Sequence, residues 1–159
     1  MQLEVTEKIR IAETNLNRAI EWHGRYNNRV AVLIALNTGM LGVITVAIKY
    51  IASFDVLTVS LYATFLLLGL SFLMILVGEY PHTKGPVNSL IYFGSVGHKI
   101  QSKFELEYES MSDDAYLNDL LEQYWIVSKL LVSKFKYLSI SLILTLLAII
   151  PWSIALLLA

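Results

Sequence analysis

The sequence predicts an all-α membrane protein with three transmembrane helices, and three observations lead to this fold class. Two long apolar stretches, residues 30–51 and 56–77, are separated only by residues 52–55, and a third covers residues 137–159. Each is long enough to cross a hydrocarbon core about 30 Å thick at about 1.5 Å of rise per helical residue. The chain also has a mean hydropathy of +0.60 and only 16% charged residues, whereas roughly a quarter of the residues of a soluble protein are charged.

Residues 1–29 are predicted to form a cytosolic amphipathic helix that continues without interruption into the first span. Apolar residues recur there at alternating spacings of four and three, which is a heptad pattern. The heptad positions are Val5, Ile9, Ala12, Leu16, Ala19, His23, Tyr26 and Val30, and the register continues into the membrane as Leu33, Asn37, Met40 and Ile44. This face can pack against the chain's own later helix or against a second copy of the chain.

The basic residues predict the orientation of the spans. Arg18, Arg25 and Arg29 precede the first span, and six lysines lie between the second and third spans, whereas only Lys49 adjoins the turn at residues 52–55. Lys and Arg are retained on the cytoplasmic side. We therefore expect a multi-pass protein with its N-terminus in the cytoplasm and its C-terminus outside, with neither a signal peptide nor an extracellular domain.

Residues 78–136 form the predicted cytosolic insert, which is small and mostly helical. Residues 100–108 have a helical pattern, and Ser112 is a suitable N-cap for a helix that runs from about Asp113 into the third span. Residues 88–97 are compatible with an extended segment or a short helix. In the third span, Pro151 is expected to kink the helix because proline lacks the amide donor.

Several function classes are excluded by composition. The chain has no cysteine, its three histidines are scattered, and no nucleophile motif or paired carboxylates are present, so we expect no metal, no catalytic residues and no enzymatic activity. Glu105, Glu107 and Glu109 are interpreted as a solvated helix face. The net charge of −1 gives no reason to expect a nucleic-acid partner. No Asp, Glu, Arg or His lies inside a span, which argues against an ion-coupled transporter.

Two groups of residues are candidates for a functional role. Asn37, with Thr38 beside it, lies about two turns into the first span, where an amide needs a partner. It can line a pore or gate, or it can make a structural hydrogen bond between helices.

The second group is a possible anion site in the insert. His82, Lys84 and Lys99 could bind a phosphate, and Tyr92 and Phe93 could stack on a base. The alternative interpretation is that the lysines only follow the positive-inside rule and that the aromatic rings only pack.

A resemblance to a known family extends from about residue 14 to residue 150. The residues that carry it are Asn17-x4-Trp22, Asn28 through Asn37-Thr-Gly39, Pro86-Val-Asn-Ser-Leu-Ile-Tyr-Phe-Gly94, and Tyr116-x6-Gln123 before Lys129. In this respect the chain resembles the transmembrane effectors of the Pycsar system, which are bacterial antiphage proteins.

The resemblance implies a function for the predicted parts. A partner nucleotide cyclase would make a cyclic mononucleotide, cUMP or cCMP, on infection, and the effector would sense it and impair the cell inner membrane, causing abortive infection. This chain has no appended nucleotide-binding domain, so the ligand is expected in the insert. Three short spans cannot enclose an aqueous path alone, so we expect a homo-oligomer in the lipid bilayer. The alternative is a non-enzymatic membrane scaffold or anchor whose cytosolic helices bind a soluble partner.

Overall fold

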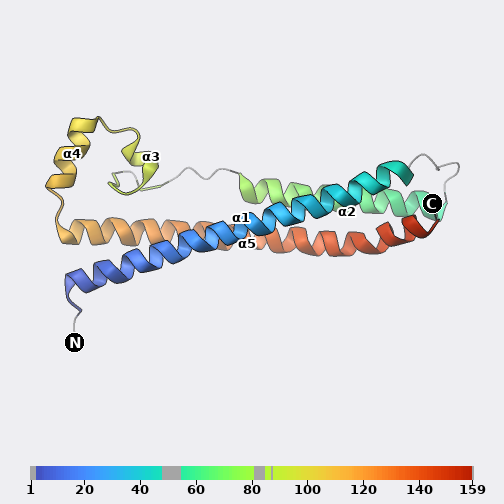
Figure 1. Cartoon of the computed structure of the whole chain (residues 1–159), viewed down its shortest axis with the longest axis horizontal. Helices are drawn as coiled ribbons and strands as arrows, with labels where there is room; N and C mark the ends of the chain where they lie inside the picture. Colours follow the sequence, from blue (N-terminus) through green and yellow to red (C-terminus); the bar gives the residue numbers. More distant parts are fainter. Residues whose placement is uncertain (1–2, 48–54, 81–84, 87, 159) are drawn as a thin grey trace. The chain divides into compact units, whose positions relative to one another are not determined.

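The computed structural model describes residues 3–47, 55–80, 85–86 and 88–158, which are almost entirely helical (Figure 1). The helices are α1 (Val5–Ala47), α2 (Val56–Glu79), α3 (Phe93–Val96), α4 (Gln101–Glu109) and α5 (Asp113–Leu158). Three of them, α1, α2 and α5, are long and apolar enough to cross a membrane. The described residues contain no strand, so the predicted all-α class with three candidate spans is confirmed.

The chain divides into two compact units, and both are built from the same two long helices. Unit 1 comprises Met1–Gly24 and Pro81–Val132, and unit 2 comprises Arg25–Tyr80 and Ser133–Ala159. Helices α1 and α5 each contribute one end to unit 1 and the other to unit 2. The expectation that the first and third spans continue as long helices beyond the apolar stretches is therefore met.

Unit 2 is a bundle of α1, α2 and α5, and each helix buries a stripe of heptad positions. On α1 the buried residues are the predicted ones: Tyr26, Val30, Leu33, Asn37, Met40 and Ile44. The stripe on α2 is Leu57, Leu61, Thr64, Leu68, Ser71, Ile75 and Gly78, and that on α5 is Lys134, Leu138, Ser141, Thr145, Ala148 and Ala155. Alternating steps of three and four keep one face of each helix turned to its neighbours.

The buried faces of unit 2 are more polar than the exposed ones. Large apolar side chains such as Phe65, Leu66 and Leu146 lie on the outside of the bundle, where a bilayer would cover them. Gly39, Gly42 and Gly69, which would permit close helix contact, have open space where a Cβ would lie. A Cβ on Gly78, in contrast, would be 3.1 Å from the Tyr26 hydroxyl oxygen.

Helices α2 and α5 each begin at a side-chain cap. Asp55 accepts the Thr58 amide at 3.0 Å and begins α2, and Ser112 accepts the Ala115 amide at 3.3 Å and begins α5, as predicted. Helix α5 continues on both sides of Pro151 to Leu158. The indole nitrogen of Trp152 donates to the Met40 carbonyl at 3.3 Å, so Trp152 joins α5 to α1.

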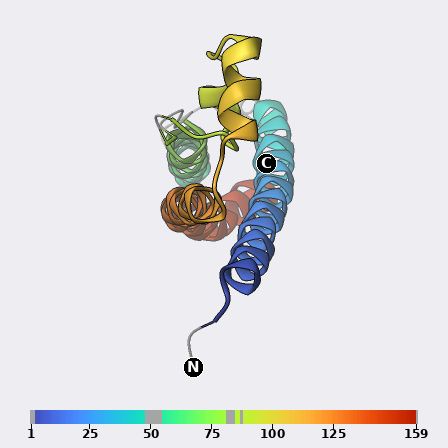
Figure 2. The same cartoon turned by 90° about the vertical axis from the view of Figure 1, so that its left-hand side faces the viewer.

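Unit 1 packs the first part of α1 against the first part of α5. Ala12 and Leu16 of α1 form a buried cluster with Leu120 of α5, and Ile91 from the connecting segment packs on it. Here the heptad face therefore contacts the chain's own later helix, one of the two predicted alternatives, while self-association stays a prediction. Helix α4 lies crosswise to α5 (Figures 1 and 2), and the ambiguous residues 88–97 contain the single short turn α3.

Candidate functional site

A fully buried polar cluster joins the three helices of unit 2. The Asn37 amide donates to Ser71 Oγ at 2.8 Å and its oxygen accepts from Thr145 Oγ1 at 2.9 Å. Ser71 Oγ lies 2.7 Å from Ser141 Oγ and 3.0 Å from Thr145 Oγ1, so α2 and α5 are also linked directly. All four side chains are inaccessible to solvent. The predicted requirement that Asn37 face another helix is met, and its side chain is satisfied on both sides.

The structure separates the two predicted gating residues. Asn37 lies inside the bundle, whereas Thr38 is on an exposed face of the same helix. In this arrangement the Asn37 side chain forms hydrogen bonds between the three helices and does not line a channel within one chain. Thr38 is available only to the surroundings of the bundle.

A second cluster lies where α1, α2 and α5 leave the apolar part of unit 2. Lys134 is almost buried, pairs with Glu79 at 3.4 Å, and has its ammonium group 4.9 Å from the centre of the Tyr26 ring. The Tyr26 ring also meets Phe135 edge to face, with centroids 5.5 Å apart. Burial, and then the carboxylate of Glu79, raise the pKa of Tyr26, so its phenol stays neutral.

In unit 1, the segment with the most specific sequence pattern is held by side chains that cap its amides. Ser89 Oγ accepts the amides of Ile91 and Tyr92 at 3.0 and 2.7 Å, and Asp119 of α5 accepts the Leu90 amide at 2.8 Å. The buried Ser89 side chain therefore provides the hydrogen bonds that the amides of Ile91 and Tyr92 would otherwise make in a helix or strand. This fixes Ile91 on the unit 1 core.

The two residues predicted to stack on a base, Tyr92 and Phe93, have different surroundings. The Tyr92 ring lies against both Gly85 and Gly94, and a Cβ on Gly94 would be 2.5 Å from Tyr92 Cε1. Glycine is needed at both positions because the ring occupies the space a side chain would take. Phe93 is 79% exposed and lies 4.8 Å from Tyr92, centroid to centroid. Only Phe93 presents a ring that is largely open to a ligand.

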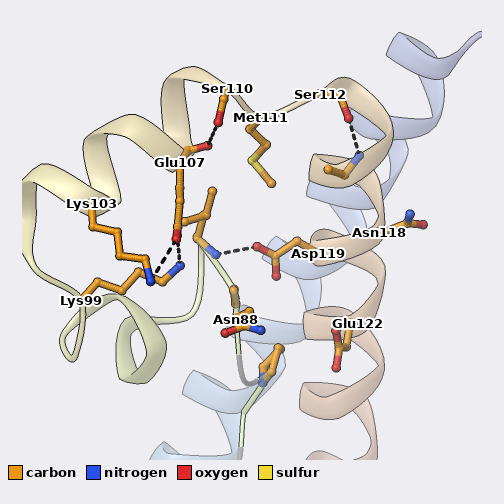
Figure 3. Close-up of a pocket in the computed structure, with 14 residues that line it drawn as sticks. Asn88, Lys99, Lys103, Glu107, Ser110, Met111, Ser112, Asn118, Asp119 and Glu122 are labelled. Atoms are coloured by element: carbon orange, nitrogen blue, oxygen red, sulfur yellow. Dashed lines mark hydrogen bonds and ion pairs between the residues drawn. The ribbon is translucent and has the colours of Figure 1, made fainter.

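The larger pocket of unit 1, which we call the lysine pocket, has a volume of about 680 Å³. Its charged lining residues are Lys99, Lys103, Glu107, Asp119 and Glu122 (Figure 3). Lys99 and Lys103 both point toward Glu107; Lys99 forms a close ion pair with it, and Lys103 lies 3.8 Å away. The hydrogen bond from Lys99 lowers the pKa of Glu107. Glu107 thus takes part in an ion-pair cluster while its side chain remains 36% exposed, and Glu105 and Glu109 are exposed, as the interpretation of a solvated helix face requires.

The predicted anion-site residues are only partly brought to this pocket. Lys99 lines it, but Tyr92 and Phe93 do not. His82 and Lys84 lie outside the described residues. The three acidic residues of the lining outnumber its two lysines, which is unfavourable for a phosphate.

A smaller pocket of about 350 Å³, which we call the tryptophan groove, lies between α1 and α5 within unit 1. Its lining residues are Asn15, Arg18, Ala19, Trp22, Tyr124, Ser128 and Leu131. They combine one guanidinium, two aromatic side chains, an amide and two hydroxyl groups, and they include no carboxylate. Sequence reasoning missed this set, although Asn15, Arg18 and Trp22 recur at steps of three and four along one helix face.

A tyrosine hydroxyl also links α1 to α5 in unit 1. Tyr116 donates its hydroxyl to Glu13 Oε1 at 2.8 Å. This hydrogen bond, with burial, raises the pKa of Tyr116 to about 12. Among the described residues, no three His, Cys, Asp or Glu side chains are grouped so that they could hold a metal ion.

The family of the protein follows from comparison of its sequence with models of known families. The model of the Pycsar effector protein domain matches residues 11–159, which is nearly the whole chain. The chain belongs to the Pycsar effector family. This Pycsar effector is accordingly an antiphage defence protein and a multi-pass membrane protein. No curated protein and no solved structure matches it.

Proposed function

We propose that this Pycsar effector resides in the bacterial inner membrane, binds a cyclic nucleotide, cUMP or cCMP, through unit 1, and then impairs membrane integrity so that the infected cell stops growing or dies. The observation that carries the proposal is the family match over residues 11–159. A partner nucleotide cyclase supplies the ligand. The N-terminus is cytoplasmic and the C-terminus outside, as the distribution of basic residues favours.

The tryptophan groove is the better candidate for the nucleotide. Arg18 can bind the cyclic phosphate with its fork of donors, and Trp22 can stack on the base. Asn15, Tyr124 and Ser128 can donate or accept hydrogen bonds. The electrostatics support this choice because no carboxylate lines the groove.

The lysine pocket is the second candidate, and it retains part of the predicted site. Lys99 would have to exchange Glu107 for the ligand phosphate, while the roles predicted for Tyr92, Phe93, His82 and Lys84 stay predictions. The three carboxylates at Glu107, Asp119 and Glu122 make this pocket the less favourable one for an anion.

The response is proposed to pass through α1 and α5, because these two helices build both the groove and the span bundle. A ligand wedged between them would change how they pack. The polar cluster of Asn37, Ser71, Ser141 and Thr145 would then lose partners within the chain and become available to line a path between subunits. In this scheme Asn37 gates, Thr38 faces a neighbouring subunit, and the active state is a homo-oligomer.

Binding can be tested on the purified chain in detergent by calorimetric titration with cUMP, cCMP and cAMP. We expect Arg18→Ala and Trp22→Ala each to weaken pyrimidine nucleotide binding at least about tenfold, the factor given by ~1.4 kcal/mol. Arg10→Ala is the matched control, because Arg10 is exposed and already paired with Glu7 at 2.6 Å. A loss confined to Lys99→Ala would move the site to the lysine pocket, and no binding in the wild type would contradict nucleotide sensing.

The membrane effect can be tested in cells that contain the matching cyclase. A potential-sensitive dye should report depolarisation after phage infection in cells with the wild-type effector, and none in cells with Arg18→Ala. If the wild-type protein leaves the membrane potential unchanged, impairment of the membrane is not its function.

One observation favours the scaffold alternative. Leu121, Trp125 and Val132 form an exposed apolar stripe on α5, and the Lys129 ammonium group lies 4.9 Å from the Trp125 ring centroid. Such a stripe is suited to contact with another helix. Overexpression separates the two functions: a scaffold should be inert, whereas an effector that is partly active without ligand should slow growth or admit a normally excluded dye.

A further inference from the structure

Unit 2 has an apolar groove between α1 and α5 that neither the polar cluster nor the tryptophan groove explains. It has a volume of about 500 Å³, and we call it the membrane groove. Its principal lining residues are Arg29, Val32 and Leu36 from α1 and Phe135, Leu138 and Leu142 from α5. From Arg29 to Leu36, and from Phe135 to Leu142, each side covers seven residue steps, which is about 10 Å along a helix.

The groove is polar at one end and apolar along the rest of its length. Arg29 lies at the end where the spans begin, with its guanidinium carbon 5.9 Å from the centre of the Phe135 ring. Deeper in the span, Val32, Leu36 and Leu142 expose roughly half or more of their surface. The nearest hydroxyl, that of Ser139, already donates to the Phe135 carbonyl at 2.9 Å. Below Arg29 the groove therefore offers a ligand only apolar contact.

Basic residues outnumber acidic ones at this end of unit 2. Arg25, Arg29, Lys134 and Lys136 are the basic residues there, and Glu79 is the only acidic residue of this end among the described part of the chain. Glu79 is already paired with Lys134. Burial of Arg29 against the apolar surface of another helix would cost free energy unless an anion accompanied it, and a lipid phosphate supplies that anion.

We propose that the membrane groove binds an anionic phospholipid, with its phosphate on Arg29 and one acyl chain along Val32, Leu36 and Leu142. Guanidinium groups bind phosphate oxygens with two parallel hydrogen bonds. Basic pockets between transmembrane helices at the membrane surface are suited to anionic headgroups. The membrane groove has both a guanidinium group for the phosphate and an apolar surface for the acyl chain. Lipid binding there does not depend on a nucleotide bound to unit 1.

The test uses the full chain in nanodiscs that contain equal amounts of phosphatidylglycerol and phosphatidylcholine with identical acyl chains. Native mass spectrometry then gives the composition of the lipids that stay bound. The wild-type protein should retain phosphatidylglycerol preferentially. Arg29→Gln, which keeps much of the side-chain stem, should reduce that preference about fivefold, corresponding to the ~1 kcal/mol that one basic residue contributes at an anionic surface.

Matched variants separate this site from general charge and from oligomer contacts. Lys136→Ala removes an exposed charge at the same end without touching the groove, so its lipid preference should equal that of the wild type. Leu36→Trp should fill the groove and reduce retention of both lipids, whereas Leu66→Trp on the exposed face of α2 should not.

Three results would overturn the proposal. The first is equal retention of the two lipids by the wild-type protein, and the second is an equal loss of preference in Arg29→Gln and Lys136→Ala. The third is a Leu36→Trp protein that dissociates from an oligomer while its lipid retention is unchanged, because the groove would then hold a second copy of the chain. Helicity measured by circular dichroism verifies that each variant is folded.

Discussion

Replacing Asn37 by leucine tests whether the buried polar cluster holds the spans together. The substitution preserves the number and branching of the side-chain heavy atoms but removes the two hydrogen bonds to Ser71 and Thr145, which are 2.8 and 2.9 Å long. Hydrogen bonds between transmembrane helices contribute about 0.6 kcal/mol on average and about 1.7 at most. Two of them therefore correspond to about 1–3 kcal/mol of the free energy of unfolding.

The remaining partners place the expected loss in the lower part of this range. Ser71 and Thr145 both retain the Ser141 carbonyl, at 3.1 and 3.0 Å, and Ser141 Oγ donates to the Ser71 carbonyl at 3.0 Å. No hydroxyl is left without an acceptor, so no further penalty for an unpaired group is added. We expect Asn37→Leu to destabilise the bundle by about 1–2 kcal/mol.

The assay is reversible unfolding of the purified chain in mixed micelles, followed by circular dichroism as the fraction of denaturing detergent rises. Thr38→Val is the control, because Thr38 is an exposed neighbour on the same helix, and we expect a change within about 0.5 kcal/mol. The cycle Asn37→Leu with Thr145→Val should be non-additive, since the two side chains share a hydrogen bond. An unchanged free energy of unfolding for Asn37→Leu, or an equal loss for Thr38→Val, would refute the reasoning.

Three further predictions concern other parts of the structure. Gly85→Ala should destabilise unit 1 by about 1–3 kcal/mol, because the new Cβ would overlap the Tyr92 ring; hydrogen exchange in residues 85–100 measures it, and unchanged protection would contradict the packing. Lys134→Met should cost about 1–2 kcal/mol in the micelle assay, because it leaves a partly exposed carboxylate unpaired, and equal stability at all pH values would argue against the ion pair. Tyr116→Phe should remove a phenol that titrates near pH 12 in an absorbance titration. Since its folded-state pKa is raised above 10, the stability it contributes is present below pH 10 and is lost as the pH rises toward 12, and a Tyr116 that titrates near pH 10 would contradict the hydrogen bond to Glu13.

The register of α1 could be read from the sequence because it depends on local periodicity. Ala12, Leu16 and Ala19 are buried as the heptad pattern predicts, and so are Tyr26 and Val30. A helix places residues three and four apart on one face whatever its partner is. For the same reason the Ser112 cap and the start of α5 were predicted correctly.

The equivalent faces of α2 and α5 were not recognised. In a bilayer both the lipid-facing and the buried surfaces of a helix are apolar, so the ordinary contrast between hydrophobic and polar residues disappears. The remaining signal was the small polar residues: Thr64 and Ser71 on α2, and Ser141 and Thr145 on α5, are all buried. The glycines of the spans give no such signal, because a Cβ on Gly39 or Gly69 would have no neighbour within 4 Å.

The residues of the candidate nucleotide site could not be predicted from local sequence patterns. Lys99 does reach a pocket, but its nearest charge is Glu107, eight residues further along the chain. The prediction used only the positions of basic residues along the sequence. Whether a carboxylate neutralises a lysine depends on their distance in the folded structure. Arg18 and Trp22 were overlooked because the groove they line on α1 is completed only by residues of α5, such as Tyr124.

The sequence by itself determined that the chain has three apolar helices, that the first and third extend far beyond the apolar stretches, and which face of α1 is buried. These features follow from the thickness of the bilayer and from the period of the helix, which act on contiguous residues. Only the tertiary structure decided that Asn37 meets Ser71 and Thr145, across 34 and 108 residues, and that Arg29 and Phe135 border one groove. Such pairs depend on how far each helix is displaced along its neighbours, and that displacement is decided by the packing of all three helices together.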